Sequence, residues 1–212
     1  MWLGAAEIDG YWKSQGYGYV FAIHGPVLDA YEVTATTCVR GFTAHRTTAA
    51  PPAFRMIDGP TYTIKAANDA DHIIVGTGAL ADISPDRVAG LPDVCRQLTP
   101  TTPLGNLEVF SRTWSEHYIA FDQRHVDWDA VVAAERQRIT DKTPPVPLFA
   151  ELESMIKPLG DMHVGISAPR LKRETPGYFR PGTDRVIRGG IGLANGPVTD
   201  DLRRTIAAVR NQ

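Results

Sequence analysis

The sequence predicts an α+β fold, with a small antiparallel β barrel or sandwich, then a short three-helix bundle, then an irregular C-terminal tail. Residues 1–98 are rich in Thr, Tyr, Val, Ile and Gly, and apolar residues alternate with polar ones, which is typical of strands. In residues 104–168 apolar residues recur every three or four positions, which is typical of helices packed on one face. A Thr- and Pro-rich linker is expected at 99–103, and residues 169–212 form the predicted tail.

The first strands are predicted from aromatic alternation around a turn. Residues 17–23 alternate large and small side chains, His24-Gly25-Pro26 interrupts them, and residues 27–34 alternate again, so a β-hairpin is expected. Further short strands, separated by Asp-, Asn- and Gly-containing turns, are expected at 53–57, 61–66 and 72–76. The polar, Thr- and Ala-rich stretch 40–52 is expected to be a mobile loop.

Three helices are predicted after the linker. The first covers 104–118, the second begins at Asp127, a residue type that favours helix N-caps, and the third covers 147–157. A short strand is expected at 164–168. The tail is rich in Gly, Pro and Arg, and one last helix is expected at 199–210.

Composition excludes several function classes. The formal net charge is −2 and neither half is strongly basic, which argues against nucleic acid as a partner. No apolar run approaches the roughly 20 residues of a membrane span. The N-terminus lacks a basic region and reaches acid at Glu7, so it does not read as a signal peptide. A cytoplasmic location is expected unless a leader has been removed.

The two cysteines, Cys38 and Cys95, leave two interpretations open. They are either reduced, partly buried thiols, or a disulfide that ties the two ends of the β-rich region together. A disulfide would indicate an oxidising, extracytoplasmic compartment. Two cysteines without clustered histidines do not form a zinc site, and no cofactor is predicted.

No self-contained active site is recognised by motif. There is no G-x-S-x-G element, and Gly189–Gly192 lacks the lysine of a phosphate-binding loop. His117 and His125 lie near Glu116 and Asp122, but surface histidines beside acids are common. No metal site is therefore predicted.

The most informative stretch is 159–164, Leu-Gly-Asp-Met-His-Val. It places His163 where a helix ends and a strand begins, so the imidazole can project into a cleft while Asp161 steadies the loop. In the structural alternative, His163 caps the preceding helix and Asp161 binds local backbone N–H groups.

The order of several uncommon residues resembles the helical segment of tail-specific (C-terminal-processing) serine peptidases, in particular their tricorn-like branch. That segment has an aromatic helix, a V-D-W-D helix start and a closing L-x-D-G-H-V, and the similarity covers about residues 104–168. The β-rich region is similar to an appendage of some bacterial members. The matching stretches are 106–110, 114–118, 121–122, 126–130, 148–149 and 158–164.

This resemblance implies that His163 is the general base of a serine peptidase and that Asp161 orients it. Met162 stands where the family usually has Gly, Pro or Ser. The implied partner is a peptide or unfolded protein substrate, and a homo-oligomer is left open. In the family the nucleophilic serine lies in a catalytic core that follows this segment.

None of the serines has the Gly-rich surroundings of an oxyanion site. They are Ser14, Ser84, Ser111, Ser115, Ser154 and Ser167. The chain is therefore expected to end before the nucleophile and not to cleave peptides alone.

The competing hypothesis is a non-catalytic scaffold whose β domain holds a ligand or a partner. Its support is the aromatic hairpin formed by Tyr17, Tyr19, Phe21 and Tyr31.

Overall fold

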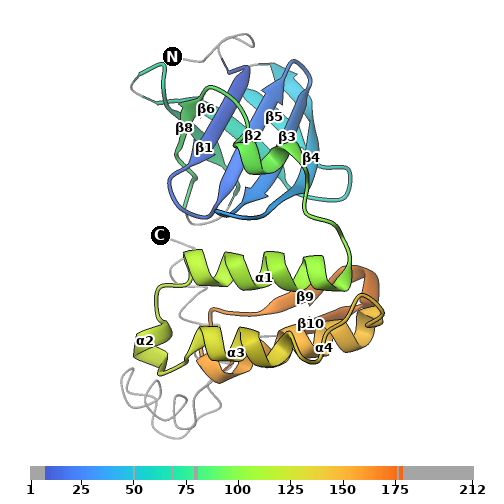
Figure 1. Ribbon diagram of the computed structural model, residues 1–212. Coiled ribbons are helices and arrows are strands. Elements are labelled where there is room, and N and C mark those ends of the chain that lie inside the picture. Colours follow the sequence, from blue (N-terminus) through green and yellow to red (C-terminus); the bar gives the residue numbers. More distant parts are fainter. Residues whose placement is uncertain (1–7, 50, 68, 79–80, 176, 179–212) are drawn as a thin grey trace, which may run out of the picture. The chain divides into compact units, whose positions relative to one another are not determined.

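The computed structural model describes residues 8–49, 51–67, 69–78, 81–175 and 177–178 (Figure 1). They fall into two compact units. The first contains the residues up to Ala120 together with Trp128–Pro144, and the second contains Phe121–Asp127 and the residues from Pro145 on.

The first unit is built on an eight-stranded sheet in which every neighbouring pair is antiparallel, in the order β7-β6-β5-β4-β3-β2-β1-β8. Isolated bridges His72↔Asp86 and Val75↔Ile83 link β7 to β8, so the sheet is a nearly closed barrel (Figure 1). The predicted hairpin at Gly25-Pro26 is the β2–β3 connection. The strands are β1 (Gly10–Ser14), β2 (Tyr19–His24), β3 (Val27–Val33), β4 (Cys38–Ala49), β5 (Pro52–Arg55), β6 (Thr61–Ala66), β7 (Ile73–Gly76) and β8 (Pro85–Val88).

The barrel interior is filled by side chains from alternate strand positions, because successive residues of a strand point to opposite faces. At one end Arg87 stacks on the ring of Trp12, with Cζ 4.0 Å from the ring centroid. The fully buried core residues are Ile8, Trp12, Phe21, Ile23, Leu28, Ala30, Ala44, Phe54, Ile64, Ile73 and Val75.

Part of the outer face of the barrel is apolar and is covered by the segment that follows β8. Val20, Ala22 and Tyr31 pack there against Leu91 and against Val94 in the 3-10 turn η1 (Asp93–Arg96). A disulfide joins Cys38 of β4 to Cys95 of η1, with the two Cα atoms 5.1 Å apart. Of the two interpretations of the cysteines, the structure therefore has the disulfide.

One expectation about the barrel is wrong. Residues 38–49 form β4, the longest strand described, and not the mobile loop expected for 40–52. Its inward positions carry Phe42, Ala44 and Arg46, so a charged residue follows two apolar ones on the inner face. The arginine stacks on Phe54, which is how a cation comes to face the interior. Strands β1 and β8 were not predicted either.

The predicted α+β fold, a barrel followed by helices, is confirmed. Helices α1 (Pro103–His117), α3 (Trp128–Glu135) and α4 (Pro145–Ile156) lie within a few residues of the three predicted ones, and a short α2 (Phe121–Arg124) is additional. The Thr102 side chain caps α1 by accepting the Gly105 N–H at 3.1 Å. No helix in the described part of the chain is long and apolar enough to cross a membrane.

In the second unit, α4 leads through η2 (Lys157–Leu159) to β9 (Ile166–Ala168), the predicted short strand. A 3-10 turn, η3 (Pro169–Leu171), then leads to β10 (Arg173–Thr175), which pairs antiparallel with β9. Most of the predicted irregular tail, from 179 to 212, lies outside the described residues, as does the helix expected at 199–210.

Candidate functional site

The loop between η2 and β9 carries both candidate catalytic residues. Gly160 leaves η2 with a φ of 54°, a conformation that glycine adopts without strain. Leu159 and Val164 on either side are buried, so they anchor the loop in the second unit. The loop is therefore fixed at both ends, and Asp161 and His163 project from a defined backbone.

Asp161 makes several polar contacts through its side chain and its main-chain oxygen, and the residue is 9% exposed. Its Oδ1 accepts the backbone N–H of His163 at 2.9 Å, and its Oδ2 lies 3.2 Å from the Arg124 guanidinium. Its main-chain oxygen accepts the N–H groups of Val164 (3.3 Å) and Tyr178 (2.9 Å). These contacts hold the carboxylate in one orientation.

The His163 ring is held by the same carboxylate. Its Nδ1 lies 3.2 Å from Asp161 Oδ1, while the side chain is 83% exposed. An ionised carboxylate can only accept, so Nδ1 must be the donor and carry the proton. In the neutral imidazole Nε2 then keeps its lone pair, and it is turned away from Asp161. A histidine so arranged can accept a proton at Nε2.

Two further residues bear on this loop. Met162 is 45% exposed, so its side chain points outward from the loop. Arg124, which sequence reasoning did not select, contacts both Asp161 and the Gly160 carbonyl. No sequence pattern links Arg124 to a loop 36 residues later, so only the fold could identify it.

Three of the serines donate to main-chain carbonyls. Ser14 donates to the Gly16 carbonyl, Ser111 to the Leu107 carbonyl at 2.6 Å, and Ser154 to the Glu151 carbonyl at 2.8 Å. Within the residues described, no hydrogen bond joins a serine hydroxyl to His163. Across the same residues no cluster of three or more His, Cys, Asp or Glu side chains is placed to hold a metal ion.

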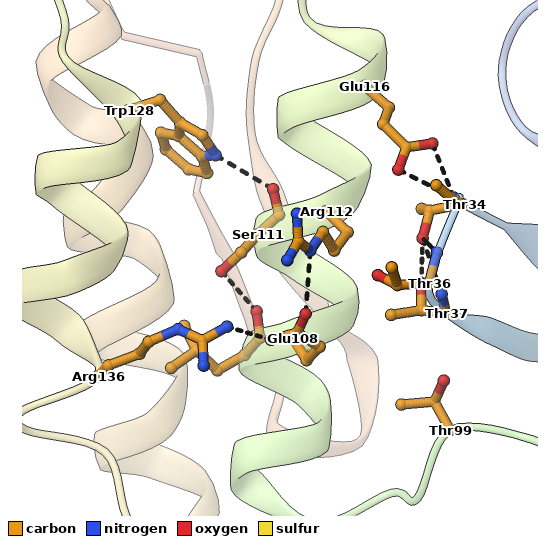
Figure 2. Close-up of polar contacts among 12 residues, drawn as sticks. Thr34, Thr36, Thr37, Thr99, Glu108, Ser111, Arg112, Glu116, Trp128 and Arg136 are labelled. Carbon is orange, nitrogen blue, oxygen red and sulfur yellow. Dashed lines mark hydrogen bonds and ion pairs between the residues drawn. The ribbon is translucent and has the colours of Figure 1, made fainter.

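A groove of about 370 Å³ lies between α1 and α3 in the first unit (Figure 2). Two of its lining residues, Arg112 and Arg136, pair with Glu108 of α1, and the Arg112 contact measures 3.0 Å. Burial raises the pKa of Glu108, but the hydrogen bonds and charges of the two guanidiniums outweigh burial and lower it overall. On the same helix pair, the Trp128 indole donates to the Ser111 carbonyl at 3.1 Å, which ties α3 to α1.

A second groove, of about 560 Å³, lies where the β1–β2 and β3–β4 turns meet the end of α1. The Glu116 carboxylate accepts the Ala35 N–H with both oxygens, at 2.9 and 3.0 Å (Figure 2). Gly18 allows the close approach of His117, because a Cβ at Gly18 would lie 2.5 Å from the His117 Nε2 atom. Lys13 and Asp93 also line this groove.

The aromatic hairpin residues do not gather into one site. Tyr17 is 67% exposed on the β1–β2 turn, with a φ of 61°. Tyr19 and Phe21 pack with the interior core, whereas Tyr31 faces outward beneath η1. The sequence missed one inward residue, Glu32, although the alternation of Leu28, Ala30 and Glu32 could have indicated it.

No family model matches the chain, and neither a curated protein nor a solved structure was found to be similar to it.

Proposed function

We propose that this chain contributes the general base of a serine-type peptidase. In this proposal His163 accepts the proton of a nucleophilic serine at Nε2, and Asp161 orients the ring. The observation that carries the proposal is the Asp161–His163 contact at 3.2 Å, on a carboxylate fixed by Arg124. The resemblance of residues 104–168, which include both residues, to tail-specific peptidases also supports it.

The nucleophile of this proposal is a serine outside the sequence described here. Ser14, Ser111 and Ser154 donate to main-chain carbonyls. A peptidase needs its nucleophile, base and oxyanion donors in one cleft. We therefore expect the 212-residue chain alone to show no turnover of a peptide substrate.

The substrate class that fits the proposal is a peptide or an unfolded protein. The Cys38–Cys95 disulfide favours an oxidising, extracytoplasmic compartment for the reaction, because disulfides are rarely maintained in the cytosol. Assembly into a homo-oligomer, left open by the sequence, is compatible with the proposal.

The test is cleavage of casein by the protein translated from the complete coding sequence. We expect turnover, and we expect a fluorophosphonate probe to label one serine. His163→Ala should lower turnover by about 100- to 10,000-fold, the usual contribution of a general base. Asp161→Asn should also lower turnover, by up to about 10,000-fold, because the amide can donate to Nδ1 and so favour the wrong tautomer of the ring.

The matched control is His45→Ala, which removes an exposed histidine from β4. It should leave turnover unchanged. Equal turnover of the wild type and His163→Ala, or an absence of fluorophosphonate labelling, would contradict the proposal.

A second candidate function is ligand binding by the β barrel, independent of catalysis. The observation that favours it is Glu32, an inward-facing carboxylate that has neither a hydrogen bond nor an ion pair among the described residues. Charges that are partly withdrawn from water are ordinarily paired, so a half-buried carboxylate without a partner at the end of a barrel favours a place for a ligand.

A further inference from the structure

The barrel end at which β2 begins carries one inward-facing carboxylate, Glu32. Strand β3 places Leu28 and Ala30 in the core, and the next alternate position is Glu32. Its neighbour Tyr31 faces outward beneath η1. Its cross-strand partner on β2 is Tyr19, which packs against the interior core. Glu32 and Tyr19 therefore share the inner face.

The charged side chains at the other end of the barrel each have a partner, although the Asp9 Oδ1 and Arg46 Nη1 atoms are buried without a hydrogen bond to another described residue. The Arg46 guanidinium donates to the Gly25 carbonyl at 2.8 Å and lies 3.9 Å from the Asp9 carboxylate. Arg87 donates to the Asp9 carbonyl at 3.0 Å and stacks on Trp12. Glu32 has no comparable partner in the described part of the chain, which makes it the exception among these inward-facing charges.

Aromatic rings surround this end of the barrel. Tyr19 and Phe21 have ring centroids 5.9 Å apart, and Phe42 and Tyr62 stack with centroids 4.7 Å apart. Tyr19, Phe42 and Tyr62 are only partly buried where they pack on the core. The β4 bulge inserts Gly41 here, and a Cβ at Gly41 would lie 3.0 Å from the Glu32 Oε1 atom. The carboxylate thus lies over a residue that has no side chain.

The titration behaviour of the cluster is consistent with this arrangement. Burial raises the pKa of Glu32. Burial and then the Glu32 charge raise the pKa of Tyr19, and burial and then Tyr19 raise the pKa of Tyr62. The three polar tips therefore lie near one another in surroundings poorer in water than the surface.

We propose that this end of the barrel binds a small alkylammonium cation, with Glu32 supplying the counter-charge and Tyr19, Phe42 and Tyr62 supplying aromatic faces. Aromatic rings attract cations through their negative faces, most strongly where water is partly excluded. A half-buried carboxylate without a cationic neighbour completes the charge complementarity. The proposal rests on the ligand-binding function proposed for the barrel and does not depend on the peptidase proposal.

The test uses choline and its uncharged isostere 3,3-dimethylbutan-1-ol, titrated into the 212-residue chain at fixed ionic strength. Binding is measured from the backbone amide NMR shifts of Tyr19, Glu32 and Gly41. We expect choline to bind about tenfold more tightly than the alcohol. Glu32→Gln should remove that preference, whereas Glu174→Gln, at an exposed carboxylate on β10, should retain it.

The wild type alone supplies a second readout. Choline affinity should fall as the pH is lowered through the raised pKa of Glu32, because the protonated carboxyl carries no charge. Affinity for the alcohol should stay constant. Equal binding of choline and the alcohol would overturn the cation inference while keeping a ligand-binding barrel. Absence of binding by both compounds would overturn the cation inference together with the binding function.

Discussion

Single carboxylates that each hold two basic groups recur in both units. In the first, Glu108 on α1 holds Arg112 of the same helix and Arg136, which follows α3. In the second, Asp161 holds Arg124 and the ring of His163. In each case one contact is local in sequence and the other joins distant segments. A residue of this kind positions its partners, so substituting it should affect both.

The first prediction concerns Glu108→Gln. The two arginines hold the pKa of Glu108 below its ordinary value of 4.5, so the carboxylate stabilises the fold above that value. This contribution is lost as the pH falls through the lowered, folded-state pKa. At neutral pH the variant should lose about 0.5 to 1 kcal/mol of unfolding free energy. Denaturant unfolding followed from neutral to acidic pH measures it.

The difference between wild type and Glu108→Gln should vanish at the acidic end of that series. Asp141→Asn, at an exposed carboxylate in the same unit, serves as control and should show little difference at any pH. A Glu108→Gln difference that persists unchanged into acid would contradict the assignment.

At the scale of elements, the seam where β7 meets β8 is joined by the isolated bridges His72↔Asp86 and Val75↔Ile83. His72 lies there with Nδ1 2.5 Å from Asp69 and Nε2 3.1 Å from Asp86. Carboxylates only accept, so both contacts are hydrogen bonds only when the ring is protonated. The hydrogen bond to Asp69 raises the pKa of His72, and the charges of Asp69, Asp86 and Asp71 add to it, against a smaller effect of burial.

The seam should therefore be pH-dependent. Because the pKa of His72 is raised above its ordinary value of 6.5, its contribution is fully present just below that value. It is lost as the pH rises through the folded-state pKa. The unfolding midpoint of wild type minus that of His72→Gln should be positive near pH 6 and fall toward zero at about pH 9. A difference that is constant over this range would exclude the seam contact.

How far the sequence predicted each element depended on the regularity of its pattern. The β2–β3 hairpin and the three main helices were predicted because their apolar residues repeat with a strict period. Strand β4 was missed because its inward face includes Arg46, and the arginine is accommodated by Phe54 on the neighbouring strand, a contact that the alternation pattern does not show. The Asp161–His163 pair could be predicted from the sequence because the two residues lie two positions apart. The contact between Arg124 and Asp161 could not be predicted, because only folding brings these two residues together.

At the scale of the whole molecule, the Cys38–Cys95 disulfide joins β4 to the segment that covers the barrel. It spans 57 residues, and closing a loop of that length in the unfolded chain corresponds to about 4 kcal/mol of stability in the chain-entropy description. The outer apolar cluster formed by Val20, Ala22 and Tyr31 depends on that segment remaining in place.

Reduction of the disulfide should lower the free energy of unfolding of the first unit by an amount close to this figure, and so lower its denaturation midpoint, measured from the near-ultraviolet signal of the barrel aromatics. The double variant Cys38→Ser, Cys95→Ser should show the same loss without reductant. An unchanged midpoint under reducing conditions would contradict a structural role for the disulfide.

The proposed chemistry depends most directly on which ring nitrogen of His163 carries the proton. The measurement is the pair of ¹⁵N chemical shifts of the neutral imidazole in the 212-residue chain. We expect Nδ1 to be protonated and Nε2 to keep its lone pair, and we expect Asp161→Asn to remove that preference. A neutral ring that carries its proton on Nε2 in the wild type would contradict the role of His163 as a general base oriented by Asp161.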